Sequence, residues 1–415
     1  MRPVRFVHAA DLHLDAPFAG VDASDPRVKS ALIASTLEAF ERIVALCIDE
    51  HVDFLVISGD VYDSSRSMTA QLGFQRQAVR LAEAGIPVFI AQGNHDPADG
   101  WSAGLTLPES VRYFSTREVE RIPVERDGEA LCTLYGRGYE HAAEGRNLAK
   151  GFVRDAADVV AIGVLHTNVG GRDGYEAYAP ASMEDLRAAR MDYWALGHIH
   201  KPEVLSEAPA IVYAGCPQGR SPKEDGVRGC YLVELTGHHA EMRFIPTCSI
   251  VWERLTVDAS SAADIEDVRR ALRAACDGAR SRADGSPAIV RVDLVGRTEA
   301  HASLVRGTVL EELVRDLREE QLASGRWVWM DRVLDRTTAA LDVDVLRASE
   351  DFAGDLVRMT DDLLADPALL ADLVASTLGP IESSLGANGD ADFAAASLLE
   401  RARDVCLDRL EGEER

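Results

Sequence analysis

The chain has 415 residues, of which 47% are apolar, and it carries a formal net charge of −25. This length and composition predict a globular protein of two or three domains and exclude a disordered chain. The acidic charge argues against a protein that holds nucleic acid by bulk electrostatics alone, so a polyphosphate substrate would need metal ions, a local basic patch or a partner protein.

Strands and helices alternate over the first hundred residues. Apolar runs and helical spacing predict three buried strands with two helices between them: strands at 3–10, 53–58 and 87–91, and helices at 27–50 and 68–84. Gly85 stands at the C′ position expected at the end of the second helix.

From residue 111 to 235 the pattern changes to mostly strands, with one helix near 181–190. The predicted strands are 131–135, 159–165, 193–196, 211–214 and 230–235. We expect them to form a second sheet packed on the first. The predicted fold class is therefore α/β, a layered β-sandwich flanked by helices.

The last 170 residues lack the polar stretches described below. Two predicted helices, one opened by a capping box at Ser261–Asp264 and one over 301–324, alternate with strands at 249–257, 288–295 and 327–334, which indicates a small α+β domain. From Leu346 onward, sixteen acidic residues face six arginines in leucine-rich helical groups, with Asp366-Pro367 as N-cap and N1. The predicted domains are 1–248, 249–341 and a helical segment, 342–415.

No run of eighteen apolar residues occurs, and the first residues lack the apolar core of a signal peptide. The seven cysteines are scattered without a CxxC pair, which is typical of reduced thiols. We therefore expect a cytoplasmic protein that does not enter a membrane.

Five short polar stretches each follow an apolar run that predicts a buried strand. They are Asp11-Leu12-His13, Gly59-Asp60-Val61-Tyr62-Asp63, Gly93-Asn94-His95-Asp96, His166, and Gly197-His198-Ile199-His200. Loops at the carboxyl ends of strands converge on one edge of an α/β sheet, so we expect these stretches to meet. By contrast, His8 lies inside the first strand and is interpreted as a packed histidine.

The residue types in these stretches fit a two-metal site for phosphoester hydrolysis. Two divalent ions supply a bridging hydroxide as nucleophile and neutralise the charge that develops on the phosphate, and such a pair needs roughly seven protein ligands. Seven candidates are present: Asp11, His13, Asp60, Asn94, His166, His198 and His200. His95 is left over beside Asn94 and can point at the substrate phosphate.

The ordered set D-x-H, GD-x-x-D, GNHD, a lone H and GH-x-H resembles the calcineurin-like metallophosphoesterase superfamily. Within it, the phrases ADLHLD, GDVYDSS, GNHDP, ALGHIHKPEVL and GCPQGR…GVRGCYLVEL are similar to the SbcD-type DNA-repair exonucleases. Asp15 and the Gln218-Gly219-Arg220 phrase favour the YhaO branch of that group. The resemblance covers roughly residues 1–250, and beyond them only the layout of a cap and a helical tail is similar.

This resemblance implies a role for each candidate. Asp11, His13, Asp60 and His200 would bind one metal, Asp60 would bridge, and Asn94, His166 and His198 would bind the other. His95 would stabilise the transition state or protonate the leaving oxygen, and Asp96 would orient His95. The family usually uses Mn²⁺, and the ligand mixture fits Mn²⁺ or Fe²⁺ at least as well as Zn²⁺, with Mg²⁺ a further candidate.

Several roles stay open at the level of sequence. Asp63 either caps its loop or supports a metal ligand. Arg220 and Lys223 either contact DNA phosphates or belong to a solvated loop. The acidic helices are either a solvated face or, as the resemblance implies, dock on the coiled-coil base of an SbcC-type ATPase. A homodimer through the nuclease domain is a further expectation from the resemblance.

The function expected from all of this is a metal-dependent DNA exonuclease or phosphodiesterase, acting as the nuclease subunit beside an SbcC-like ATPase, with residues 249–341 as a cap over the site. One alternative is a metallophosphoesterase that acts on nucleotides or small phosphoesters. The other is a catalytically inert scaffold subunit.

Overall fold

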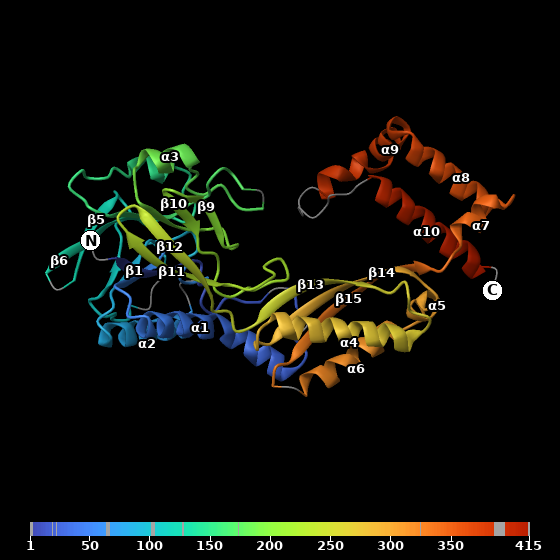
Figure 1. Cartoon of the computed structure of the whole chain (residues 1–415), viewed down its shortest axis with the longest axis horizontal. Helices are drawn as coiled ribbons and strands as arrows, with labels where there is room; N and C mark the ends of the chain where they lie inside the picture. Colours follow the sequence, from blue (N-terminus) through green and yellow to red (C-terminus); the bar gives the residue numbers. More distant parts are fainter. Residues whose placement is uncertain are drawn as a thin grey trace. The chain divides into compact units, whose positions relative to one another are not determined.

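A computed structural model of the chain describes residues 3–18, 20–21, 23–63, 67–100, 104–126, 128–172, 174–323, 325–385 and 395–413. The chain divides into two compact units (Figure 1): an N-terminal unit, Met1–Glu253 with Ala283–Ile289, and a C-terminal unit, Arg254–Arg282 with Val290–Arg415. The predicted division into three domains at 248 and 341 stays a prediction.

The first sheet of the N-terminal unit has six strands in the order β12-β11-β1-β2-β3-β4. Its strands are β1 Val4–Ala9, β2 Phe54–Ile57, β3 Val88–Ile90, β4 Val111–Tyr113, β11 Gly229–Thr236 and β12 His239–Pro246. β1 to β4 run parallel, whereas β11 pairs antiparallel with β1, and β12 with β11. The three early strands are confirmed. Placing the strand at 230–235 in the second sheet was wrong, because it pairs with the free edge of β1.

The second sheet also has six strands, in the order β5-β6-β7-β8-β10-β9. They are β5 Glu120–Arg126, β6 Glu129–Arg137, β7 Ala161–His166, β8 Tyr193–Gly197, β9 Glu203–Glu207 and β10 Ala210–Tyr213. The four central strands are parallel, and the edge strands β5 and β9 are antiparallel to their neighbours. The predicted second sheet is therefore confirmed, with four of its six strands foreseen.

Helices cover the outer faces of the two sheets: α1 Pro26–Asp49, α2 Met68–Glu83, α3 Met183–Ala188 and the short 3-10 helix η1 Leu148–Gly151. Asp25 and Ser67 cap α1 and α2 by accepting hydrogen bonds from backbone amides in the first turn. α2 ends at the C-cap Ala84, and Gly85 follows with φ +73°, so the predicted C′ glycine is confirmed.

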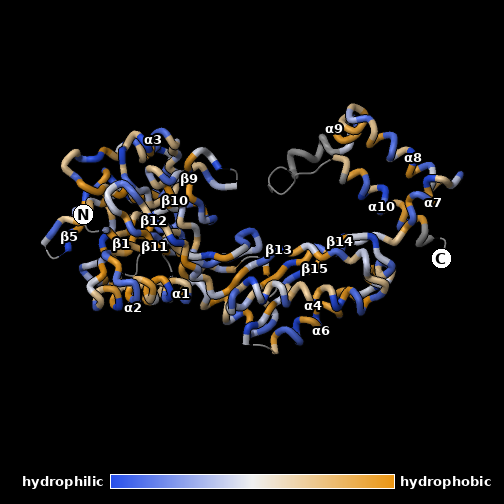
Figure 2. Tube along the Cα trace, viewed as in Figure 1, coloured by the Kyte–Doolittle hydropathy of each residue, from blue (hydrophilic) through white to orange (hydrophobic). Residues whose placement is uncertain are grey.

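The core is layered because side chains alternate across each strand. Phe6 of β1 faces the second sheet: its ring stacks on Phe54 of the neighbouring strand β2 at 5.0 Å and meets the edge of Tyr193 of the second sheet at 5.2 Å. The next residue, Val7, faces the other way and packs with Phe40 and other residues of α1 and α2. This one-sided burial agrees with the mixed apolar and polar colouring along α1 and α2 in Figure 2. The predicted helix-flanked sandwich is confirmed.

The C-terminal unit contains a three-stranded sheet in the order β13-β14-β15, with α4 and α6 packed against it. The elements are β13 Val251–Asp258, α4 Ile265–Arg282, β14 Ala288–Thr298, α5 His301–Leu304, α6 Val309–Leu322 and β15 Val328–Ala339. The single helix predicted over 301–324 is two helices, because the chain turns at Gly307 with φ +53°. The capping box predicted at Ser261–Asp264 was wrong, because α4 begins at Ile265: Asp264 accepts from the amide of Asp267 at 3.0 Å, and Asp267 accepts from the amide of Ala263 at 2.9 Å.

The rest of this unit is helical: α7 Val343–Ala348, α8 Phe352–Ala365, α9 Pro367–Leu385 and α10 Ala395–Glu413. Asp366 accepts hydrogen bonds from the amides of Ala368 and Leu369 at 3.0 and 3.2 Å, which confirms it as the N-cap of α9. α10 packs on α8 and β15, and Arg297 of β14 lies 2.6 Å from Asp404 of α10. No helix in the described part of the chain has the length and apolar character that a membrane span requires.

Candidate metal centre

The five polar stretches lie at the carboxyl ends of β1, β2, β3, β7 and β8, which belong to both sheets. Two backbone hydrogen bonds of 3.0 Å join the first two loops, from the amide of Asp11 to the carbonyl of Gly59 and from the amide of His13 to the carbonyl of Asp60. The backbone amide of His198 lies 3.1 Å from each carboxylate oxygen of Asp11. Loops from the two sheets are therefore fastened to each other at this point.

Four of the seven predicted ligands have left-handed backbone conformations, which side-chain-bearing residues rarely adopt. The φ angles are 50° for Asp11, 43° for His13, 50° for Asp60 and 100° for His198. Such strain persists only where the surrounding structure determines the conformation, and it concentrates at functional sites.

Two motif glycines permit close packing of the site residues. A Cβ atom on Gly59, whose φ is +98°, would overlap the imidazole of His166, and a Cβ on Gly93 would overlap the carboxylate of Asp60. The glycine that begins each of these motifs therefore leaves the space that a predicted ligand occupies.

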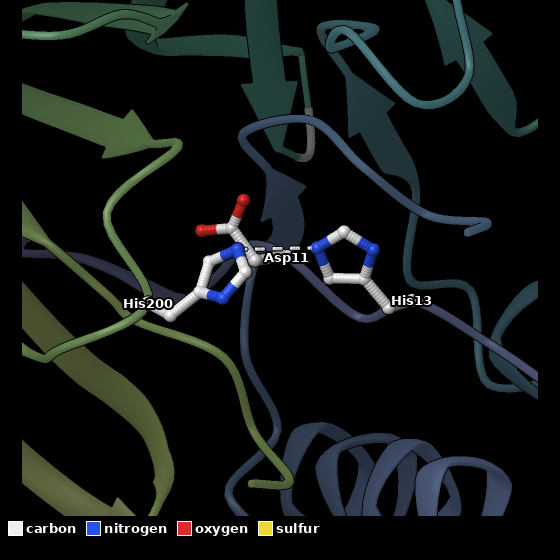
Figure 3. A group of neighbouring side chains, drawn as sticks. All are labelled: Asp11, His13 and His200. Carbon is white, nitrogen blue, oxygen red and sulfur yellow. Dashed lines mark hydrogen bonds between the residues drawn. The ribbon is translucent and has the colours of Figure 1, made fainter. Parts of the chain in front are cut away.

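One group of predicted ligands consists of Asp11, His13 and His200 (Figure 3), whose ligand atoms lie within 4.8 Å of one another. The Nε2 atoms of His13 and His200 face each other at 3.3 Å. Asp60 is buried beside them, with Oδ2 3.7 Å from Nε2 of His13.

The other group gathers around Asn94. Its Oδ1 lies 2.9 Å from Nε2 of His166 and 3.3 Å from Nδ1 of His198. Oδ2 of Asp60 lies 3.5 Å from Nε2 of His166, so Asp60 stands between the two groups. All seven predicted ligands come together in one site, with Asp60 between the two groups; its role as a bridging carboxylate stays a prediction.

Each of the four histidines has one ring nitrogen toward the site and the other near an oxygen atom outside it; for His166, His198 and His200 that outer contact is a hydrogen bond, whereas for His13 it is an ionic contact with Asp63. The outer nitrogens face Asp63 Oδ1 (His13 Nδ1, 3.2 Å), Glu224 Oε1 (His200 Nδ1, 2.6 Å), Ser58 O (His166 Nδ1, 3.0 Å) and Glu176 O (His198 Nε2, 2.9 Å). Metal-binding histidines have this arrangement. Without a cation, several acceptor atoms would face one another in a buried space.

The charges of the site also fit a divalent cation. Burial and the neighbouring Asp60 raise the pKa of Asp11 well above its usual range. Burial also raises the pKa of Asp60, but His166, His13 and His95 outweigh that effect and bring it to about 2. Burial lowers the pKa of His13, which favours the neutral imidazole that a metal requires. Two adjacent buried carboxylates are costly alone, and bound cations would offset that cost.

His95 lies at the mouth of the site. Its side chain is 41% exposed, its ring meets the edge of the His13 ring at 4.8 Å, and its Nδ1 lies 3.4 Å from the carbonyl oxygen of Asp63. The imidazole is thus exposed next to the ligands, and its contact with the substrate phosphate stays a prediction.

Asp96 has different partners from those that the sequence suggested. Its carboxylate is buried and accepts hydrogen bonds from the backbone amides of Val61 and Gly93 at 2.8 and 2.9 Å. Burial and then Asp60 raise the pKa of Asp96 to about 8. The carboxylate thus fastens the loops that carry Asp60 and Asn94, and its described hydrogen bonds go to backbone amides rather than to the imidazole of His95.

The two candidate phosphate contacts differ in their surroundings. Arg220 is 15% exposed and donates to Asp63 Oδ1 at 3.0 Å, with Glu224 Oε1 at 3.5 Å, so its guanidinium is engaged by carboxylates. Lys223 is exposed and lines a cavity of about 600 Å³ together with His200 and Lys201. Of the two side chains, that of the lysine is the more exposed.

Glu224 was not predicted, because it contacts His200 from a loop with no recognisable ligand spacing. The role of Asp63 was open at the level of sequence, and the structure brings Asp63 against His13. His8, interpreted as a packed histidine, is fully buried with its nitrogens 3.0 Å from Tyr193 Oη and 3.2 Å from Ser58 Oγ.

Comparisons with known proteins agree with the geometry. The calcineurin-like phosphoesterase family profile matches residues 4–202, and the profile of the metallophosphoesterase YhaO middle domain matches residues 252–338. The uncharacterized metallophosphoesterase YhaO of Bacillus subtilis (strain 168) is 36% identical over 335 residues, which cover 80% of this chain and 81% of that protein.

Two more distant relatives have names that refer to nucleases or DNA repair. The DNA double-strand break repair protein Mre11 of Haloferax volcanii is 28% identical over 63% of this chain and 56% of its own length. A subunit of the nuclease SbcCD from Bacillus subtilis (strain 168) is 26% identical over 54% of this chain and 64% of its own length. The match thus spans less than two thirds of each of these two relatives.

Proposed function

The chain belongs to the calcineurin-like metallophosphoesterases, and from this premise we propose that it is a two-metal nuclease that hydrolyses DNA phosphodiester bonds. The observation that supports the proposal is the convergence of seven predicted ligands, four of them imidazoles, in one buried site. DNA as the substrate is supported by the distant relatives named as part of a nuclease and as a double-strand break repair protein.

In this proposal Asp11, His13, Asp60 and His200 hold one ion, and Asn94, His166 and His198 hold the other together with Asp60. The mixture of carboxylate, amide and imidazole ligands suits Mn²⁺. When bound, the two ions would supply a water of lowered pKa and neutralise charge on the phosphate.

The protein's own groups would do the rest. His95, exposed at the mouth of the site, would donate a proton to the leaving oxygen or a hydrogen bond to the phosphate. Asp96, through the amides of Val61 and Gly93, would keep the loops that carry Asp60 and Asn94 in place. Lys223, exposed beside His200, would contact a neighbouring phosphate of the strand.

A partner would help an acidic chain to meet DNA. The helical segment exposes apolar side chains on α9, with Leu369 53% and Leu373 38% exposed, among acidic neighbours. We assign this surface to docking on the coiled-coil base of an SbcC-like ATPase, which would supply basic DNA contacts. The remaining parts of the proposal are a capping role for residues 249–341, a homodimer through the nuclease domain, and a cytoplasmic location.

The net charge of −25 favours one second candidate, a metallophosphoesterase for nucleotides or other small phosphoesters. Small substrates need only the metal site, whereas a DNA strand meets a large acidic surface. The same catalytic groups would serve both substrates.

The test compares Mn²⁺-dependent hydrolysis of linear duplex DNA, single-stranded DNA and a chromogenic phosphodiester by the purified chain, with and without the ATPase partner. Asp60→Asn and His95→Ala should abolish or strongly reduce release, while exposed His239→Asn should leave it unchanged. Hydrolysis of the chromogenic ester alone, with DNA intact even beside the partner, would favour the small-substrate candidate. Equal background release by wild type and His95→Ala would favour the inert scaffold.

A further inference from the structure

The two halves of the proposed metal site are supported by different kinds of group. His166 and His198 donate their outer N–H groups to backbone carbonyls, those of Ser58 and Glu176, at 3.0 and 2.9 Å. The outer nitrogens of His13 and His200 instead lie next to side-chain carboxylates: Nδ1 of His200 is hydrogen-bonded to Glu224 at 2.6 Å, and Nδ1 of His13 makes an ionic contact with Asp63 at 3.2 Å. Of the two halves, the one that contains His13 and His200 is therefore supported by side chains and not by the backbone.

One arginine joins the two carboxylates. Arg220 Nη1 lies 3.0 Å from Asp63 Oδ1, and its Nη2 lies 3.4 Å from His200 Nδ1 and 3.5 Å from Glu224 Oε1. Its backbone amide donates to Glu224 Oε2 at 2.6 Å. We call Asp63, Arg220 and Glu224 the carboxylate bracket. It links residues that are 157 positions apart in sequence across the mouth of the site.

We propose that the carboxylate bracket positions His13 and His200 and thereby sets the affinity of one of the two metal ions. The inference rests on the proposed metal site and deepens it. It assigns functions to Glu224, which no motif singled out, and to Arg220 and Asp63, whose functions were open at the level of sequence.

The physical reason lies in the orientation of two rings. A carboxylate that accepts from an outer N–H fixes the tautomer and the rotation of the imidazole, and it raises the basicity of the nitrogen that faces the metal. Two such carboxylates close to each other would repel, and a guanidinium between them removes that repulsion while it fixes their separation. A lysine would retain the positive charge but present one nitrogen in place of the planar fork that reaches both.

Because Arg220 belongs to the carboxylate bracket, we do not expect it to bind the substrate phosphate. Its side chain is 15% exposed and faces carboxylates on both sides, so a phosphate would have to displace Asp63 or Glu224 in order to reach it. Lys223, exposed on the same loop, has no such restriction.

The test measures Mn²⁺ binding to the full chain, by isothermal titration and by the electron paramagnetic resonance of free Mn²⁺, in the absence of any substrate. Wild type should take up two ions. Glu224→Ala and Arg220→Met should weaken one of the two binding steps by about 10- to 100-fold and leave the other step unchanged. Glu224→Gln, which keeps an oxygen acceptor, and Arg220→Lys, which keeps the charge, should show intermediate losses.

Arg154→Met is the matched control. Arg154 is 16% exposed, forms a 2.9 Å ion pair with Asp192 in the same unit, and lies near the amino end of β8, away from the metal loops. This variant should lose stability but keep both binding steps of the wild type. Thermal unfolding of the metal-free variants shows whether a loss of Mn²⁺ affinity comes from unfolding of the protein. If Glu224→Ala or Arg220→Met is unfolded, the Mn²⁺ affinities of Glu224→Gln and Arg220→Lys decide whether the bracket sets the affinity of one ion.

Unchanged affinities in folded Glu224→Ala and Arg220→Met would overturn the inference, as would an equal weakening of both steps. This readout is independent of the reaction. If wild type binds two ions and the bracket variants lose affinity for one of them, but wild type cleaves no DNA, the proposed nuclease function fails and the role of the bracket stands. If wild type cleaves DNA and the bracket variants bind both ions normally, the nuclease function stands and the role of the bracket fails.

Discussion

Gly59→Ala should damage the metal site through a single methyl group. Gly59 adopts φ +98°, and a Cβ atom there would overlap Nδ1 of His166, the atom that donates to the carbonyl of Ser58. Gly85 offers a matched comparison, because it has φ +73° at the end of α2 and nothing lies within 4 Å of the place its Cβ would take.

The expected magnitudes follow from these surroundings. Both alanines force a left-handed backbone, which costs about 1–2 kcal/mol. Gly59→Ala adds overpacking against a buried ring, about 1–3 kcal/mol more, for a total of about 2–5 kcal/mol. The displaced His166 should also weaken Mn²⁺ binding in its half of the site by about 10- to 100-fold, whereas Gly85→Ala leaves binding unchanged.

Urea unfolding of the metal-free proteins, followed by tryptophan fluorescence and far-ultraviolet circular dichroism, gives the loss of stability, and Mn²⁺ titration gives the loss of affinity. The reasoning is refuted if Gly59→Ala destabilises the N-terminal unit no more than Gly85→Ala and binds Mn²⁺ as wild type does. That result would mean that His166 is free to move away from the new methyl group.

His95→Ala should lower kcat by about 10²–10⁴-fold while Mn²⁺ affinity stays near that of wild type, and a parallel loss of Mn²⁺ binding would make His95 a ligand instead. Saturation with Mn²⁺ at a hundred times its dissociation constant should raise the free energy of unfolding by about 2.7 kcal/mol for each site filled. Chelation of Mn²⁺ should reverse this rise in the free energy of unfolding. The rise should be much smaller in Asp60→Asn and unchanged in His239→Asn. If Mn²⁺ stabilises Asp60→Asn as strongly as wild type, the bridging role of Asp60 is contradicted. Phe74→Ala should cost about 3–5 kcal/mol by urea unfolding, because the ring is fully buried and stacked 5.4 Å from Phe40. Exposed Leu72→Ala should stay within about 0.5 kcal/mol of wild type, and similar costs for the two variants would show that this core repacks.

The site was predictable from the sequence because local patterns determine it. Each predicted ligand lies at the end of an apolar strand, and the carboxyl ends of parallel strands share one edge, which brings together the ligands that one sheet carries. Asp11 and His200 follow strands of different sheets, so their meeting depends also on how the two sheets pack. Glycine before Asp60, Asn94 and His198 was a further local signal, which the close packing at Gly59 and Gly93 explains.

Features that depend on distant pairing were not predictable in this way. Glu224 has no motif, because its importance comes from where its loop lies in space and not from its neighbours in sequence. The role of Asp96 was similar: its position beside His95 suggested contact with that ring, but its hydrogen bonds go to the amides of Val61 and Gly93.

Local sequence patterns also failed where two different structures are compatible with similar sequences. A glycine inside a helical pattern is often tolerated, so Gly307 did not reveal the break between α5 and α6. The edge strand β12 alternates half-buried and exposed residues, a weaker signal than the apolar runs of the central strands.

The position of β11 has a consequence for protein synthesis. β1 leaves the ribosome long before its antiparallel partner, which is among the last parts of the N-terminal unit to be translated, since Val4 pairs with Leu235. Until then one side of β1 presents unpaired amides and carbonyls, the kind of edge that recruits other strands. Nascent chains that stall between β3 and β11 should therefore be the most aggregation-prone species during production of this protein.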